Sequence, residues 1–92
     1  MEVSVSKIKE IVASDKVAHV KYVRVKNEFR YAIVDGVVEH QHLLKEGEIP
    51  LSAGFFSFSS GVFLLHPMPS VTLNLGPIAE DETLLKTIFL GE

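Results

Sequence analysis

The chain has 92 residues, of which 47% are hydrophobic and 23% are charged, and its formal net charge is −3. It contains no cysteine, which excludes disulfides, zinc–thiolate sites and cysteine nucleophiles. A chain of this length forms one domain, 1–92, and buries only about 60–65% of the surface that its unfolded form exposes. We therefore expect some apolar side chains to stay on the surface unless a second copy or a partner covers them.

The apolar runs, such as 61–65, are far shorter than the roughly 20 residues that a membrane-spanning helix needs. The first residues also lack a basic region followed by an apolar one, the pattern of a secretory signal. These features predict a soluble cytoplasmic protein that does not associate with a membrane.

Basic residues are concentrated near the start of the chain: the first 30 residues carry a charge of +3 and the remainder −6. Lysines and arginines bind the phosphates of nucleic acids, so this asymmetry raises that function. The basic residues nevertheless form no dense cluster, and none lies between Glu46 and Lys86, where four of the six phenylalanines are. We interpret the charges as solvated faces of a helix and a hairpin, and nucleic acid is not an expected partner.

The first half of the chain predicts a helix followed by three strands. Apolar residues recur at three-to-four spacing over 5–14, which predicts a short amphipathic helix with Ser4 as its N-cap. Strands are predicted over 17–26, 29–34 and 37–42. In the first strand the apolar alternation shifts at Tyr22-Val23, which indicates either a bulge or a strand covered on both faces. Asp35-Gly36, between the last two strands, is typical of a type I′ hairpin turn.

The second half predicts three more strands and a helix. The strands are expected at 53–58, 62–65 and 71–75, the last of which alternates cleanly between apolar and polar residues. Three acids at 80–82 favour the start of a helix, which Gly91 ends. The whole pattern predicts an α+β domain, an antiparallel sheet of about six strands flanked by an N-terminal and a C-terminal helix.

Both faces of the hairpin rich in phenylalanine are apolar, whereas an antiparallel sheet usually keeps one face polar. Two short helices cover one face only, so the other face needs a second sheet, and a copy of the chain would supply it. The alternative is that the sheet curls into a barrel or sandwich. We predict a homodimer, or an unknown protein partner, with these interface residues: Phe56, Phe58, Phe63 and Leu65.

A pair of histidines, His40 and His42, raises the question of a metal site. In a strand both imidazoles point to the same side, where they reach one divalent transition metal if a further ligand completes the shell. The sequence does not place His19 or His66 beside them. Two other interpretations stay open: ordinary hydrogen bonding on a partly exposed strand, and an interface that responds to pH.

Two resemblances bear on family. The stretch from Gly36 through His40 and His42 to Glu46 and Gly54 resembles the first motif of the cupin barrels. That resemblance implies a metal-binding barrel, although three residues instead of five separate Gly36 from His40. The second cupin motif would also place a histidine where this chain has a threonine at position 72.

The second resemblance covers the C-terminal half, which combines Ser-Ala-Gly-Phe at 52–55, a serine-to-glycine stretch at 70–76 and an acidic helix start at 80–82. It is similar to small uncharacterised bacterial proteins described as hypothetical. The similarity implies a compact bacterial cytoplasmic protein and brings no activity with it.

No catalytic motif is present: the chain has no Gly-x-Ser-x-Gly elbow, no Gly-x-Gly-x-x-Gly turn and no Walker-type phosphate loop. We therefore predict a non-enzymatic, self-associating protein-interaction module that needs no cofactor. The alternative hypothesis is a small metal-binding or ligand-binding β-rich protein that uses His40 and His42.

Overall fold

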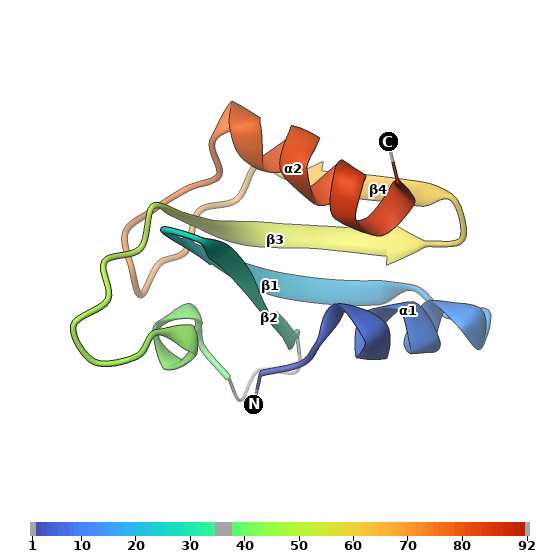
Figure 1. The fold of residues 1–92 in the computed structure, drawn as a ribbon, viewed down its shortest axis with the longest axis horizontal. Coiled ribbons are helices and arrows are strands. Elements are labelled where there is room, and N and C mark those ends of the chain that lie inside the picture. The colour runs from blue at the N-terminus through green and yellow to red at the C-terminus, as the bar shows by residue number, and fades with distance from the viewer. Residues whose placement is uncertain (1, 35–37, 92) are drawn as a thin grey trace.

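The computed structural model describes residues 2–34 and 38–91, which form a four-stranded antiparallel sheet with two α-helices (Figure 1). The strand order is β2-β1-β3-β4. The elements in chain order are α1 (Val5–Ala13), β1 (Ala18–Val25), β2 (Glu28–Ile33), the short 3-10 helix η1 (His40–Leu43), β3 (Ser52–Ser59), β4 (Val62–His66) and α2 (Ala79–Leu90). The α+β class and the two terminal helices are confirmed, but the prediction of six strands is wrong.

Local chemistry explains the start of α1 and the end of α2, and both were predicted from the sequence. The hydroxyl of Ser4 accepts a hydrogen bond from the backbone N–H of Lys7 at 3.1 Å and so caps the start of α1. After α1 the chain reverses at Asp15, whose φ of 63° lies in the left-handed region. Gly91 ends α2 with a φ of 75°, a conformation that glycine adopts without steric cost.

Each face of the sheet has its own hydrophobic core. The core on the first face joins both helices to all four strands: Ile8, Ala18, Val20, Tyr22, Tyr31, Phe56, Phe58, Phe63, Leu85 and Phe89. The core on the second face is smaller: Val23, Val25, Ala32, Leu43 and Ala53. Tyr22 and Val23 are both completely buried, one in each core, while the ladders of β1 with β2 and with β3 run through them without interruption. The shift in apolar alternation therefore marks a strand covered on both faces, not a bulge.

In the described part of the strand predicted over 37–42, the chain forms η1 from His40 onward instead of a strand, and residue 37 lies outside the described residues. The backbone N–H of His42 donates to the carbonyl of Glu39 at 3.0 Å, and the His42 ring accepts from the Glu39 N–H at 3.0 Å. This reciprocal pair closes a tight turn, and Leu43 then enters the second core with 4% of its surface exposed. The hairpin predicted at 35–36 lies outside the described residues.

The strand predicted over 71–75 is also wrong. The segment is a turn that is closed by a bridge between Ser70 and Leu75, and Asn74 has a φ of 54°. A residue in the left-handed region interrupts an extended chain, so the alternating pattern cannot continue as a strand. The apolar positions are still used, because Leu73 and Leu75 pack against the second core.

Candidate functional site

Only half of the second face of the sheet is covered. At one end of the face, η1 and the turn near 70–75 pack over the second core, while the other end carries no covering element among the described residues. Seven side chains line this uncovered end, which we call the open patch: His19, Val34, Ser57, Val62, Leu64, His66 and Met68. The open patch is the largest departure from the usual polar outer face of an antiparallel sheet.

Strand register brings the open patch together from β1, β3, β4 and the residue that follows β2. Ser57 pairs with His19 of β1 on one side and with Leu64 of β4 on the other. Val34, directly after β2, joins the same row because its N–H donates to the His19 carbonyl at 2.9 Å. Val62 and Leu64 are separated by one residue in β4, so their side chains point to the same face.

Four of the seven side chains of the open patch are apolar, and none of the seven carries a fixed charge. Val62, Leu64 and Met68 keep 58%, 57% and 55% of their surface exposed. A shallow hollow of about 170 Å³ lies beside them, and His19, Val34, His66 and Met68 are among its lining residues. None of the seven side chains of the patch is a carboxylate, a lysine or an arginine. Large apolar side chains grouped in this way are typical of an interaction surface.

A serine and two histidines form a polar line through the open patch. The Ser57 hydroxyl oxygen lies 3.2 Å from Nδ1 of His19 and 2.8 Å from Nε2 of His66. A serine hydroxyl has one proton, so at most one imidazole receives it while the other donates its own N–H. The line therefore links β1, β3 and β4 across the exposed face.

The pair of Ser57 and His66 has the separation of a nucleophile and its general base. Nucleophilic catalysis also needs a group that orients the base and donors that stabilise an oxyanion. Within residues 2–34 and 38–91, no hydrogen bond holds Nδ1 of His66. The geometry thus favours a structural hydrogen-bonded line over an acyl-transfer site.

The cover over the other half of the second face is held by a buried cation. Arg30 is 2% exposed, and both of its terminal nitrogens donate to the carboxylate of Glu48, one of them at 2.6 Å. It also donates to the Leu43 carbonyl at 3.0 Å. These bonds raise the pKa of Arg30 and lower the pKa of Glu48 to about 2. The bonds of Arg30 to Glu48 and to Leu43 therefore join β2 to the segment that covers this half of the face.

The two histidines of the metal hypothesis lie in different environments. His40 is 4% exposed, and its Nε2–H donates to the Gly54 carbonyl at 2.9 Å, while its ring packs edge-on against Phe55. Burial lowers the pKa of His40 below its ordinary value. His42 is exposed and uses Nδ1 to cap η1. Both histidines belong to η1 and not to a strand, so the shared side that a strand would give them is lost. The described residues contain no group of three or more histidine or acidic side chains placed to hold a metal ion.

The four residues predicted as an interface lie inside the chain. Phe56, Phe58 and Phe63 are 1%, 6% and 8% exposed in the first core, and Leu65 packs against that core. Their aromatic rings contact Phe89 of α2, which covers this face. The apolar surface that remains on the hairpin is the opposite side of β4, in the open patch.

Sequence reasoning missed the link between His19, Ser57 and His66. Each histidine is isolated in the sequence, and only the register of β3 against β1 and β4 brings them to one serine. The available signal was that His19 and Lys21 share one side of their strand, but this parity does not identify the partner strand.

Comparisons with known proteins add no further constraint. No family model matches this chain, and no curated protein or solved structure is similar to it. The described residues include no helix long and apolar enough to cross a membrane.

Proposed function

We propose that this protein is a non-enzymatic interaction module that associates with a second copy of itself through the open patch. The observation that carries the proposal is the half-covered second face, where Val62, Leu64 and Met68 are more than half exposed beside an uncharged surface. Burial of apolar surface is the main driving force of such association.

The open patch has the features that a two-fold symmetric contact requires. Such a contact uses the same surface on both subunits, so protruding and hollow regions must occur together. Val62 and Leu64 protrude from β4, and the hollow beside His19 and His66 lies on the same face. The patch holds no acidic, lysine or arginine side chain, so two copies that meet there bring no like fixed charges into direct contact, although each copy has a net charge of −3.

The size of the open patch sets the expected strength. A residue in a standard interface buries roughly 30–40 Å², so seven residues from each copy bury on the order of 500 Å² in total. Stable complexes bury about 1,200 Å² or more. Because the expected area is below that of stable complexes, we expect a weak dimer that dissociates at low protein concentration.

Sedimentation equilibrium from about 10 µM to about 1 mM protein would test this, because a weak dimer gives a molar mass that rises over that range. The substitution Leu64→Glu places a charge in the centre of the patch and should leave a monomer. Ile49→Glu is the matched control, since Ile49 is 79% exposed and lies outside the patch. It should associate like the unchanged protein.

Two results would contradict the proposal. The first is a monomer at every concentration, which would assign the open patch to a different protein partner. The second is an equal loss of association in the Leu64→Glu and Ile49→Glu variants, which would show that added negative charge, not the location of the patch, matters.

A further inference from the structure

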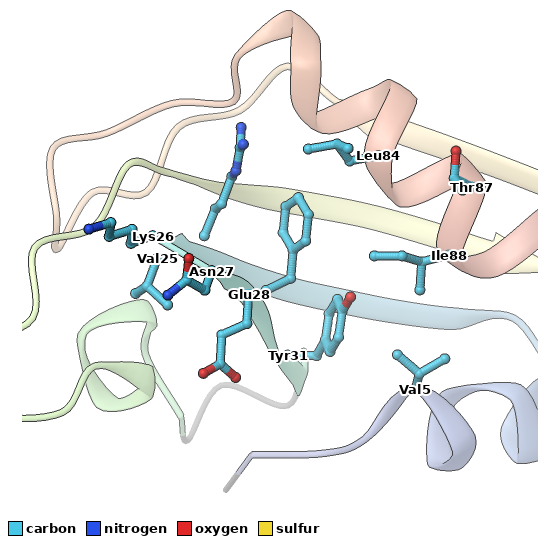
Figure 2. A pocket seen from close by; sticks show the side chains of 11 residues that line it. Val5, Val25, Lys26, Asn27, Glu28, Tyr31, Leu84, Thr87 and Ile88 are labelled. Carbon is cyan, nitrogen blue, oxygen red and sulfur yellow. The ribbon is translucent and has the colours of Figure 1, made fainter.

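A second surface, on the helix-covered face, has the form of a small-molecule site. An open groove of about 510 Å³ lies between α1 and α2 above β2 (Figure 2). Its walls include Val5 of α1, Phe29 and Tyr31 of β2, and Leu84 and Ile88 of α2. This volume and this apolar lining are in the range of sites that bind small organic molecules.

One polar group inside the groove has no partner. Tyr31 is 5% exposed, and its ring packs edge-on against Phe56 and Phe89. Across residues 2–34 and 38–91 its hydroxyl makes no hydrogen bond, whereas the other tyrosine, Tyr22, donates to Asp81 at 2.7 Å. Figure 2 shows the Tyr31 hydroxyl at the end of a ring that extends from β2 toward Ile88. The hydroxyl is not one of the buried side-chain atoms that lack a partner, so solvent reaches it from the groove and it can donate to a molecule bound there.

The charged groups around the groove are already engaged or face away from it. Arg24 donates to Glu80 at 2.6 Å and to Asp81 at 3.3 Å. Glu28 accepts from Arg30 at 3.3 Å. Figure 2 shows the amine of Lys26 directed away from the groove. The groove therefore offers mostly apolar walls and the neutral polar side chains of Tyr31 and Asn27, while the Thr87 hydroxyl donates to the Thr83 carbonyl.

We propose that the groove binds a small uncharged molecule with an aromatic or aliphatic body and one carbonyl-type oxygen, which accepts the hydrogen bond of Tyr31. The body of the ligand packs between Val5, Leu84 and Ile88, and the oxygen receives the O–H. This site lies on the face of the sheet opposite the open patch, so it does not depend on self-association.

Two probes of the same shape separate the apolar and polar contributions. Acetophenone has an aromatic ring and a carbonyl oxygen, and ethylbenzene has the ring without the oxygen. Amide chemical shifts of the ¹⁵N-labelled protein, recorded during titration with each probe, report binding at individual residues. We expect shifts to concentrate at Val5, Tyr31 and Ile88, with acetophenone bound about three- to tenfold more tightly than ethylbenzene, the ratio that one hydrogen bond gives.

The substitution Tyr31→Phe keeps the ring and removes the donor. It should make the affinities for the two probes equal and leave the affinity for ethylbenzene unchanged. The proposal is overturned if neither probe shifts groove amides, or if the preference for acetophenone survives in Tyr31→Phe. If the Tyr31→Phe variant is unstable, the unchanged protein still tests the proposal. Equal affinities of that protein for acetophenone and ethylbenzene would show that the hydroxyl plays no part in binding.

Discussion

Removal of the Asp81 carboxylate should be among the most destabilising single changes in this chain. Asp81 is completely buried near the start of α2, and its two oxygens accept three hydrogen bonds. The donors are the Tyr22 hydroxyl at 2.7 Å, the Ile78 N–H at 3.1 Å and the Arg24 guanidinium at 3.3 Å. Together these bonds join α2 to the central strand β1 at the edge of the first core.

The expected magnitude follows from what Asp81→Ala leaves behind. The Tyr22 hydroxyl loses its acceptor inside the core, Ile78 loses the cap at the start of α2, and Arg24 loses one of its two carboxylate partners. Breaking a buried charged network of this kind costs about 3–5 kcal/mol. Since Arg24 keeps its bond to Glu80, we expect a loss near the lower end, about 3 kcal/mol, in the free energy of unfolding. For a domain of this size, that lowers the melting temperature by about 15 °C.

Urea unfolding followed by circular dichroism measures this loss, and Tyr22→Phe provides the second side of a double-mutant cycle. Tyr22→Phe alone should cost about 1–2 kcal/mol, because it removes one bond to a charged acceptor. The two losses should be strongly non-additive in the Tyr22→Phe/Asp81→Ala variant. A loss below about 1 kcal/mol for Asp81→Ala, or strict additivity, would refute the idea that this network joins α2 to the sheet.

Three further predictions concern the cover and the strands beneath it. The pKa of Glu48, about 2 against about 4.3 in an unfolded chain, means that its contribution to stability is complete above about pH 5 and is lost as the pH falls toward 2. Urea unfolding between pH 7 and pH 2.5 should show a smaller acid loss in Glu48→Gln, and an unchanged loss would contradict the assignment. Gly54→Ala should destabilise by about 1–3 kcal/mol, because its Cβ would lie 3.0 Å from the completely buried ring of Tyr22; a neutral result in the same assay would mean that the ring has room to shift. Zinc should leave the melting temperature unchanged, and a rise that disappears in the His40→Ala/His42→Ala variant would restore the metal hypothesis.

Local features of the fold were predictable because the forces that determine them act within a few residues. Ser4 caps α1, and Gly91 ends α2 with a positive φ. The positions of the four observed strands were predicted to within two residues at each end from apolar alternation and turn chemistry. The predictions of strands over 37–42 and 71–75 were wrong, although both segments have strand-like patterns. In the first, hydrogen bonds between Glu39 and His42 close a turn. In the second, the left-handed conformation of Asn74 does so.

The functional surfaces were not predictable, for a physical reason that the strand hairpin illustrates. Alternation showed that Phe63 and Leu64 point to opposite faces, but both are apolar, and composition cannot decide which face the helices cover. In the structure α2 covers Phe63, and Leu64 is left in the open patch. The residues predicted as an interface therefore lie on the face that the helices cover, and the exposed apolar residues of the hairpin lie on the other face. The same ambiguity concealed the position of the Tyr31 hydroxyl, since a sequence does not state which side chains line a groove.

The sequence by itself determined the α+β class, the Ser4 cap of α1, the glycine that ends α2, the positions of the four observed strands, and an apolar excess that a single small domain hides with difficulty. Tertiary structure alone decided the strand order, and with it the meeting of His19, Ser57 and His66. It also decided that Arg30 and Glu48 hold a cover over one half of the second face and leave the other half open. Propensity and periodicity are local quantities, whereas exposure and hydrogen-bond partners depend on which distant segments pack together.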